Sequence, residues 1–103
     1  MHVISRRALR EFWEEHPPAK TPLAAWFRIL EIGSFADFNA IKRAFGTADY
    51  LAPYTIFDVG GNKYRVIAVI HYNRQRVYVR HVFTHPEYDT WFTKVRSAKR
   101  SKR

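Results

Sequence analysis

The sequence predicts one α+β domain, in which N-terminal helices pack on a curved, mainly antiparallel sheet that a C-terminal helix follows. Apolar residues before Gly46 recur at helical spacing, whereas those after it follow the two-residue period of strands joined by tight turns. The 103 residues are 47% hydrophobic and include no cysteine, so they suit one globular core without disulfides. We expect the domain to span residues 1–96 and a flexible basic tail to span 97–103.

The first elements are expected to be a short strand and a helix. Residues 1–4 are suited to a strand, after which Ser5 can cap a helix over residues 6–15. Apolar side chains within that helix are spaced to form one face. Pro17 and Pro18 are expected to end it, because proline cannot continue the hydrogen-bond pattern of a helix.

Two further helices are expected before the strands. Thr21 is a candidate N-cap with proline at the first helical position, and the helix should continue to about Ile32. Gly33 is well placed to end it. A shorter helix is expected over residues 37–45, where three apolar residues are spaced to dock on a core.

Three strands are expected after Gly46, over residues 54–59, 63–72 and 76–84. The pair Gly60-Gly61 indicates the first hairpin turn, because glycine adopts the positive φ angles that such turns require. Residues 73–75 are expected to form the second turn. Thr84 and Glu87 have the spacing of a capping box, which predicts a last helix continuing through Val95.

The length of the turns determines which side chains share a face of the sheet. If both turns are even, the core face collects Thr55, Phe57, Val59, Tyr64, Val66, Ala68, Ile70, Tyr72, Val77, Val79, His81 and Phe83. The other face then collects Tyr54, Asp58, Lys63, Arg65, His71, Arg76, Tyr78, Arg80 and Thr84, among aliphatic residues. An odd second turn would bury Arg80 without a partner, which is costly, so we expect the even register. His81 is then expected to be a hydrogen-bonded core histidine.

Net charge indicates a polyanionic partner. The formal charge is +9 and the isoelectric point is about 10.3, which suits nucleic acid, an acidic membrane face or an acidic protein. However, the last ten residues carry six of the positive charges, and a like-charged tail is also explained by solubility alone. No stretch is apolar and long enough to span a membrane or act as a secretory signal, so we expect a cytoplasmic protein.

Two segments resemble the HigB family of toxins. Residues 57–66, Phe-Asp-Val-Gly-Gly-Asn-Lys-Tyr-Arg-Val, are similar to that family's F-x-V-G-G-N-x-x-R-[VIL] motif. Residues 78–89, Tyr-Val-Arg-His-Val-Phe-Thr-His-Pro-Glu-Tyr-Asp, are similar to its [YC]-[IV]-R-x-[VIF]-x-T-H-x-E-Y-D motif. The opening residues 1–5, which lead into a helix, resemble the family as well.

This resemblance implies a RelE-like fold and a type II toxin. The toxin would be an endoribonuclease that cuts mRNA in the ribosomal A site. Its partner would be a HigA-type antitoxin that carries a helix-turn-helix. The cleavage implied uses the neighbouring 2′-OH as nucleophile and needs a base, an acid and cations, but no metal ion or other cofactor. Only RNA carries that hydroxyl group.

Two arginines are the electrostatic candidates for this chemistry. Arg65 and Arg80 lie in the two motifs and are expected on the same face of the sheet. A guanidinium offers phosphate a planar set of donors and stays charged at working pH. The alternative is that they are salt-bridge partners of Asp58 or Asp89.

His85 and Tyr88 are the candidates for proton transfer. Histidine exchanges a proton near neutral pH, and His85 lies where a strand meets a helix N-terminus, which favours phosphate binding. Tyr88 is three residues further along and could donate a proton, stack on a base or simply pack. His85 could equally serve only the turn, and Glu87 is better explained by the capping box.

Six further polar residues are candidates for RNA contact, namely Asn62, Lys63, Lys42, Arg43, Lys99 and Arg100. Asn62 could equally serve its turn, and solvated charge is the default interpretation of Lys42 and Arg43. The five histidines lack metal-binding spacing, so no metal site is predicted. Two alternatives to an RNase remain: a non-catalytic RNA- or ribosome-binding module, and a domain that docks an acidic protein.

Overall fold

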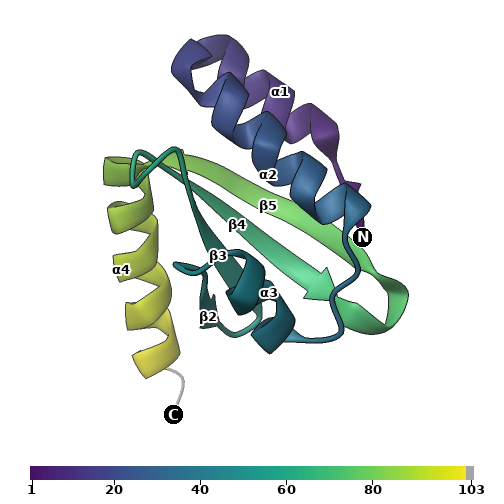
Figure 1. Ribbon diagram of the computed structural model, residues 1–103. Coiled ribbons are helices and arrows are strands. Elements are labelled where there is room, and N and C mark those ends of the chain that lie inside the picture. Colours follow the sequence, from purple (N-terminus) through teal and green to yellow (C-terminus); the bar gives the residue numbers. More distant parts are fainter. Residues whose placement is uncertain (102–103) are drawn as a thin grey trace.

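The computed structural model describes residues 1–101 and forms the predicted α+β fold (Figure 1). The elements in chain order are β1 (His2–Ile4), α1 (Arg6–Glu15), the 3-10 helix η1 (Pro17–Ala19), α2 (Lys20–Ile32), α3 (Phe38–Ala44), β2 (Asp49–Leu51), β3 (Tyr54–Val59), β4 (Tyr64–His71), the 3-10 helix η2 (Tyr72–Arg74), β5 (Arg76–Thr84) and α4 (His85–Ser101). The bounds predicted for α1, β3 and β5 are confirmed.

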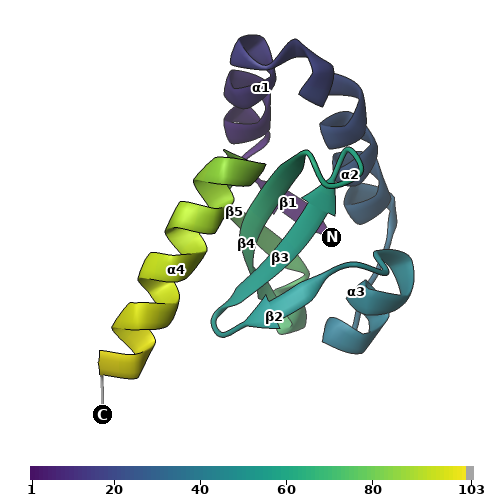
Figure 2. The ribbon, with the colours of Figure 1, turned by 90° about the vertical axis from the view of Figure 1, so that its left-hand side faces the viewer.

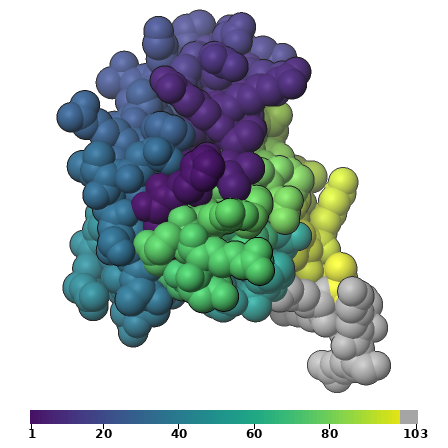
Figure 3. Space-filling view, turned by 90° about the vertical axis from the view of Figure 1, so that its right-hand side faces the viewer, coloured from purple at the N-terminus to yellow at the C-terminus, as the bar shows by residue number. Residues whose placement is uncertain are grey.

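The five strands form one sheet in the order β1-β5-β4-β3-β2. β1 pairs with β5 in parallel and every other pairing is antiparallel. Figure 3 shows the N-terminal strand lying against the β4–β5 hairpin, which is distant from it in sequence. The edge strand β2 was not predicted, because three residues are too few to display a two-residue period.

The helix caps differ in part from those predicted. Ser5 stands at the N-cap of α1 but makes no side-chain capping bond. α2 begins at Lys20, directly after η1, so Thr21 lies inside the first turn and the prediction that it caps the helix is wrong. Asp37 does cap α3, since its side chain accepts a hydrogen bond from the Ala40 amide at 3.0 Å.

Gly33 ends α2 as predicted, but the reason for glycine there is space. Its φ of −93° is accessible to any residue. A Cβ atom at this position would lie 2.6 Å from the ring of Phe35 and 2.9 Å from the Ile29 carbonyl oxygen. The close approach of these two groups therefore favours glycine.

The core lies between one face of the sheet and the first three helices. Leu9 of α1, Leu30 of α2 and Ile41 of α3 are fully buried, as are Phe57 and Val66 of the sheet. We call this side of the sheet the core face. Figure 2 shows α2 and α3 on this side and α4 on the other.

Both hairpin turns are even, as predicted. Val59 pairs with Tyr64, and His71 pairs with Arg76, so each turn holds four residues. Gly60, Gly61 and Asn62 adopt φ angles of 69°, 63° and 85°, which explains the two glycines in the first turn.

A bulge in β5 corrects part of the predicted alternation. Ile67 pairs with His81 but Ala68 pairs with Val79, so Arg80 is an extra residue between them. An inserted residue reverses the sides on which later side chains project. His81 and Phe83 therefore lie opposite the core, and the prediction that His81 is a core histidine is wrong.

We call the side opposite the core the α4 face. It carries Tyr54, Ile56, Asp58, Arg65, Ile67, Tyr78, His81 and Phe83. The C-terminal helix α4 packs on part of it, with Trp91 in edge-to-face contact with Tyr54 at 5.2 Å between ring centroids. Within residues 1–101, no helix combines the length and apolar character needed to cross a membrane.

Candidate functional site

Arg65 lies at the centre of a polar junction on the α4 face. The residue is 7% exposed, and its Nε atom is 2.9 Å from the Asp58 carboxylate. Its Nη2 donates to Asn62 Oδ1 at 2.6 Å, and its Nη1 donates to the Tyr64 carbonyl at 3.2 Å. A guanidinium has five N–H donors. Three are engaged in these contacts.

The start of α4 closes over this guanidinium. The ring of Tyr88 lies 5.1 Å from the Arg65 Cζ atom, a cation–π distance. The His85 amide donates to the Lys63 carbonyl at 3.1 Å, which ties α4 to the tip of the β3–β4 hairpin. Glu87 accepts from the Thr84 amide at 2.8 Å, so its role at the helix start is confirmed. Arg65, Tyr88 and His85 therefore gather at one end of the sheet.

His85 is oriented by a carboxylate on its own helix. Its Nδ1 atom lies 3.2 Å from Asp89 Oδ2, and 41% of its side chain is exposed. A hydrogen bond at one imidazole nitrogen determines which nitrogen is available for other partners. The Asp89 contact therefore leaves Nε2 as the atom that can exchange a proton with a substrate.

Tyr88 is held in its protonated form. Burial raises the pKa of the Tyr88 phenol, and the Arg65 guanidinium lowers it. The carboxylates of Asp49, Asp58 and Asp89 raise this pKa further. A phenol whose pKa lies above its ordinary value of about 10 keeps its proton at neutral pH. The geometry and charge around Tyr88 therefore suit a proton or hydrogen-bond donor better than a base.

This raised pKa predicts a stability change at alkaline pH. Above about pH 10, the Tyr88 phenol of the unfolded chain ionises more readily than that of the folded chain. The folded state then binds more protons, so the free energy of unfolding should fall as pH rises. Tyr88→Phe should reduce that fall, measured by urea unfolding at pH 8, 10 and 11. The prediction is contradicted if the free energy of unfolding falls equally with pH in Tyr88→Phe and in the unmodified chain. Tyr50→Phe, at an exposed tyrosine, is the matched control.

Arg80 does not join the junction around Arg65. Its guanidinium lies 5.6 Å from the ring centroid of Tyr78, on the α4 face. In the pairing of β4 with β5, Arg65 lies opposite Phe83. Phe83 is three residues from Arg80, a separation of roughly 10 Å along a strand. The two arginines thus share a face, as expected, but occupy separate positions on it.

The RNA-contact candidates lie in different places. Asn62 and Lys63 are exposed at the hairpin tip, where Asn62 also holds Arg65. Lys42 and Arg43 are exposed on α3, on the other side of the sheet, and Lys42 Nζ donates to the Ala48 carbonyl at 2.8 Å. α4 continues to Ser101, but the side chains of Lys99 and Arg100 lie outside the described residues. The flexibility of the 97–103 tail stays a prediction.

Sequence reasoning missed an aromatic cluster beside the junction. His81 and Phe83 stack with a centroid distance of 5.0 Å and an interplanar angle of 11°. The ring centroid of Trp91 in α4 lies 5.8 Å from that of His81 and 5.9 Å from that of Phe83. The bulge at Arg80 places both rings here, and the alternating pattern of β5 contains no signal of it.

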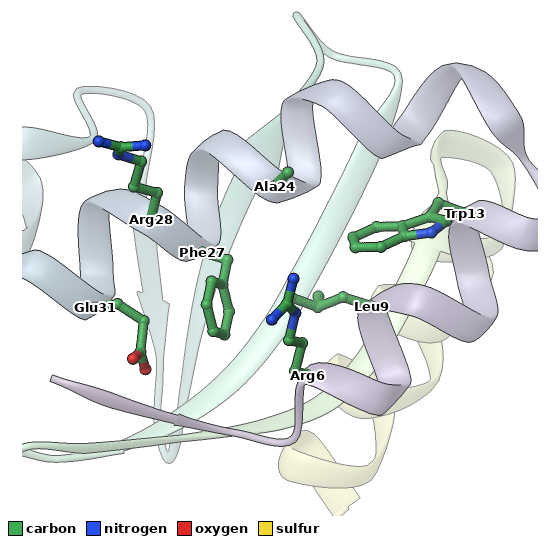
Figure 4. Close-up of a pocket in the computed structure, with 7 residues that line it drawn as sticks. All are labelled: Arg6, Leu9, Trp13, Ala24, Phe27, Arg28 and Glu31. Carbon is green, nitrogen blue, oxygen red and sulfur yellow. The ribbon is translucent and has the colours of Figure 1, made fainter.

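The groove between α1 and α2 lies away from this site. It has a volume of about 320 Å³, and Figure 4 shows Trp13 and Phe27 along it, with Arg6 between them. These helices cover the core face, whereas the Arg65 junction lies on the α4 face. Among the described residues, no three histidine or acidic side chains are placed to hold a metal ion.

Comparison with known proteins identifies the family. Residues 19–91 match the family described as HigB_toxin, the RelE-like toxic component of a toxin-antitoxin system. The mRNA interferase toxin HigB of Escherichia coli K12 is 38% identical over 105 aligned residues, which cover 99% of this chain and all of the relative. The mRNA interferase HigB of Escherichia coli O6:H1 is 33% identical over 86% of this chain and 89% of its own length. The chain therefore belongs to the HigB family of RelE-like toxins.

Proposed function

We propose that this chain is an endoribonuclease toxin that cleaves mRNA in the ribosomal A site and is inhibited by a HigA-type antitoxin. The observation that supports it most is the junction of Arg65, Tyr88 and His85 where the β3–β4 hairpin meets α4. The similar proteins of Escherichia coli are named mRNA interferases, which supports the same chemistry.

The junction offers each group that metal-free RNA cleavage requires. The Arg65 guanidinium suits the charge that gathers on the phosphoryl oxygens. His85 Nε2 would take the proton of the attacking 2′-OH or protonate the leaving 5′-oxygen, and Tyr88 would be a protonated donor nearby. The products would be a cyclic phosphate and a free 5′-OH.

Arg80 is assigned to binding the RNA backbone beyond the scissile phosphate. Its distance from the junction, roughly 10 Å along β5, supports a contact with a neighbouring nucleotide. Asn62 and Lys63 at the hairpin tip are proposed to contact the same RNA molecule at the other end of the site. Lys42, Arg43, Lys99 and Arg100 are proposed to contact RNA outside the active site.

Expression in bacterial cells tests this proposal. We expect arrested growth and internally cut transcripts, mapped by primer extension, and we expect Arg80→Ala to restore growth. Arg10→Ala, at an exposed arginine of α1, is the matched control and should remain toxic. Intact transcripts alongside normal growth would refute the proposal. Slow growth with intact transcripts would instead favour a non-catalytic RNA- or ribosome-binding module.

Two further measurements address the partners. Purified chain is expected to cut mRNA when ribosomes are present and to leave it intact without them. A short helix-turn-helix reading frame beside the gene is expected to restore growth when co-expressed. If the protein encoded by that frame does not bind the chain, the antitoxin assignment is wrong. The nuclease assignment is tested separately, by primer extension.

A further inference from the structure

The exposed ring of His81 is the end of an aromatic stack beside the proposed cleavage site. One of its faces lies against Phe83, at an interplanar angle of 11°, and Trp91 flanks both rings. His81 is nevertheless exposed, whereas Phe83 and Trp91 are only partly so. The stack therefore ends at a surface ring that another flat group can continue.

We infer that His81, supported by Phe83 and Trp91, is a platform on which one unpaired nucleobase next to the scissile phosphate stacks. This inference rests on the proposed function and adds a binding site to it. Aromatic side chains stack bases without regard to sequence, and single-stranded RNA is the nucleic acid whose bases are free to do so.

The position of the stack fits a nucleotide bound at the junction. Phe83 pairs directly with Arg65, and His81 is two residues further along β5, about 7 Å away. Arg80, the neighbour of His81 in β5, lies over the ring of Tyr78 at 5.6 Å. The guanidinium of this neighbouring residue would be available to the phosphate of a nucleotide whose base stacks on His81.

The charge state of His81 also suits stacking. The part of His81 that is shielded from solvent lowers the pKa of its imidazole, and the neighbouring Arg80 guanidinium lowers this pKa further. The imidazole is therefore neutral at neutral pH, and it offers a flat ring while Arg80 supplies the charge. Tyr78 and His71 extend the aromatic surface along the strands with an edge-to-face contact at 5.2 Å.

Binding of an RNA that cannot be cleaved tests the platform. The probe is a fluorescent 2′-O-methyl oligoribonucleotide, in which the nucleophile is blocked, compared with an abasic oligomer of the same length. His81→Ala should bind the 2′-O-methyl oligomer with a Kd about 5-fold to 100-fold higher than that of the unmodified chain, because stacking on one base is lost. His81→Phe should bind within about twofold of the unmodified chain, because stacking is retained. Both variants should bind the abasic oligomer equally.

Three results would overturn the inference. These are an unchanged Kd in His81→Ala, an equal loss on the abasic oligomer, and a His81→Phe chain as weak as His81→Ala. His2→Ala, at an exposed histidine of β1, is the matched control. Primer extension with the unmodified chain is read separately, so a failure of the nuclease proposal is distinguishable from a failure of the platform. When the purified chain cuts mRNA with ribosomes present, His81→Ala should raise KM and leave kcat within about threefold, whereas loss of an acid or base would lower kcat.

Discussion

Replacement of Arg65 is expected to cost both stability and cleavage, and the two losses can be separated. Arg65, which is 7% exposed, is the counter-ion of Asp58, whose side chain is 28% exposed, and the donor to Asn62; Arg65→Met removes both contacts. Breaking a buried ion pair from one side costs about 3 kcal/mol of the free energy of unfolding, and the partial exposure of Asp58 reduces this cost to roughly 1–3 kcal/mol. Cleavage should fall at least about 100-fold, as for loss of one donor to a transition-state oxyanion.

A double variant distinguishes a catalytic arginine from a structural one. Arg65→Met combined with Asp58→Leu leaves no unpaired charge, and such apolar replacements are often neutral for stability. We expect urea unfolding to show most of the stability restored, while primer extension shows cleavage still lost. Recovery of cleavage together with stability would show that Arg65 only holds the hairpin and α4 in place.

Replacement of His85 is expected to abolish cleavage with little effect on folding. Loss of a general acid or base lowers kcat by roughly 100-fold to 10,000-fold. The side chain of His85 is 41% exposed, and its amide, which binds the Lys63 carbonyl, remains in any substitution except proline. His85→Ala should therefore retain the thermal midpoint of the unmodified chain while transcripts stay intact.

Asp89 provides the matched test of how His85 is positioned. Asp89→Asn retains the shape of the side chain but no longer favours a proton on His85 Nδ1, 3.2 Å away. We expect a smaller loss of kcat than in His85→Ala, together with a changed pH profile of cleavage. A His85→Ala chain that cuts mRNA within about twofold of the unmodified rate would remove His85 from the chemistry.

Much of the fold was predictable because local rules determine it. The helical spacing before Gly46 and the prolines at 17 and 18 locate α1 without reference to the rest of the chain. The first hairpin was predictable because Gly60 and Gly61 supply the positive φ angles of its turn. The candidates Arg65, Tyr88 and His85 came from residue types and a family resemblance, and the structure brings them together.

The start of α2 and the strand β2 were beyond these rules. Thr21 has the composition of a cap, but η1 already winds the chain before it, so the helix begins at Lys20. β2 is three residues long and is defined by its pairing with β3 rather than by its own pattern. Both features depend on neighbours that a local pattern does not contain.

The sequence by itself determined the α+β class, the even register of both hairpins and the candidate residues Arg65, His85 and Tyr88. Only the tertiary structure decided how those residues are held and what lies beside them. The Arg80 bulge transfers His81 and Phe83 to the α4 face, and α4 brings Trp91 onto them. A bulge adds no residue type that marks it, because it arises from how two strands pair and not from either strand alone.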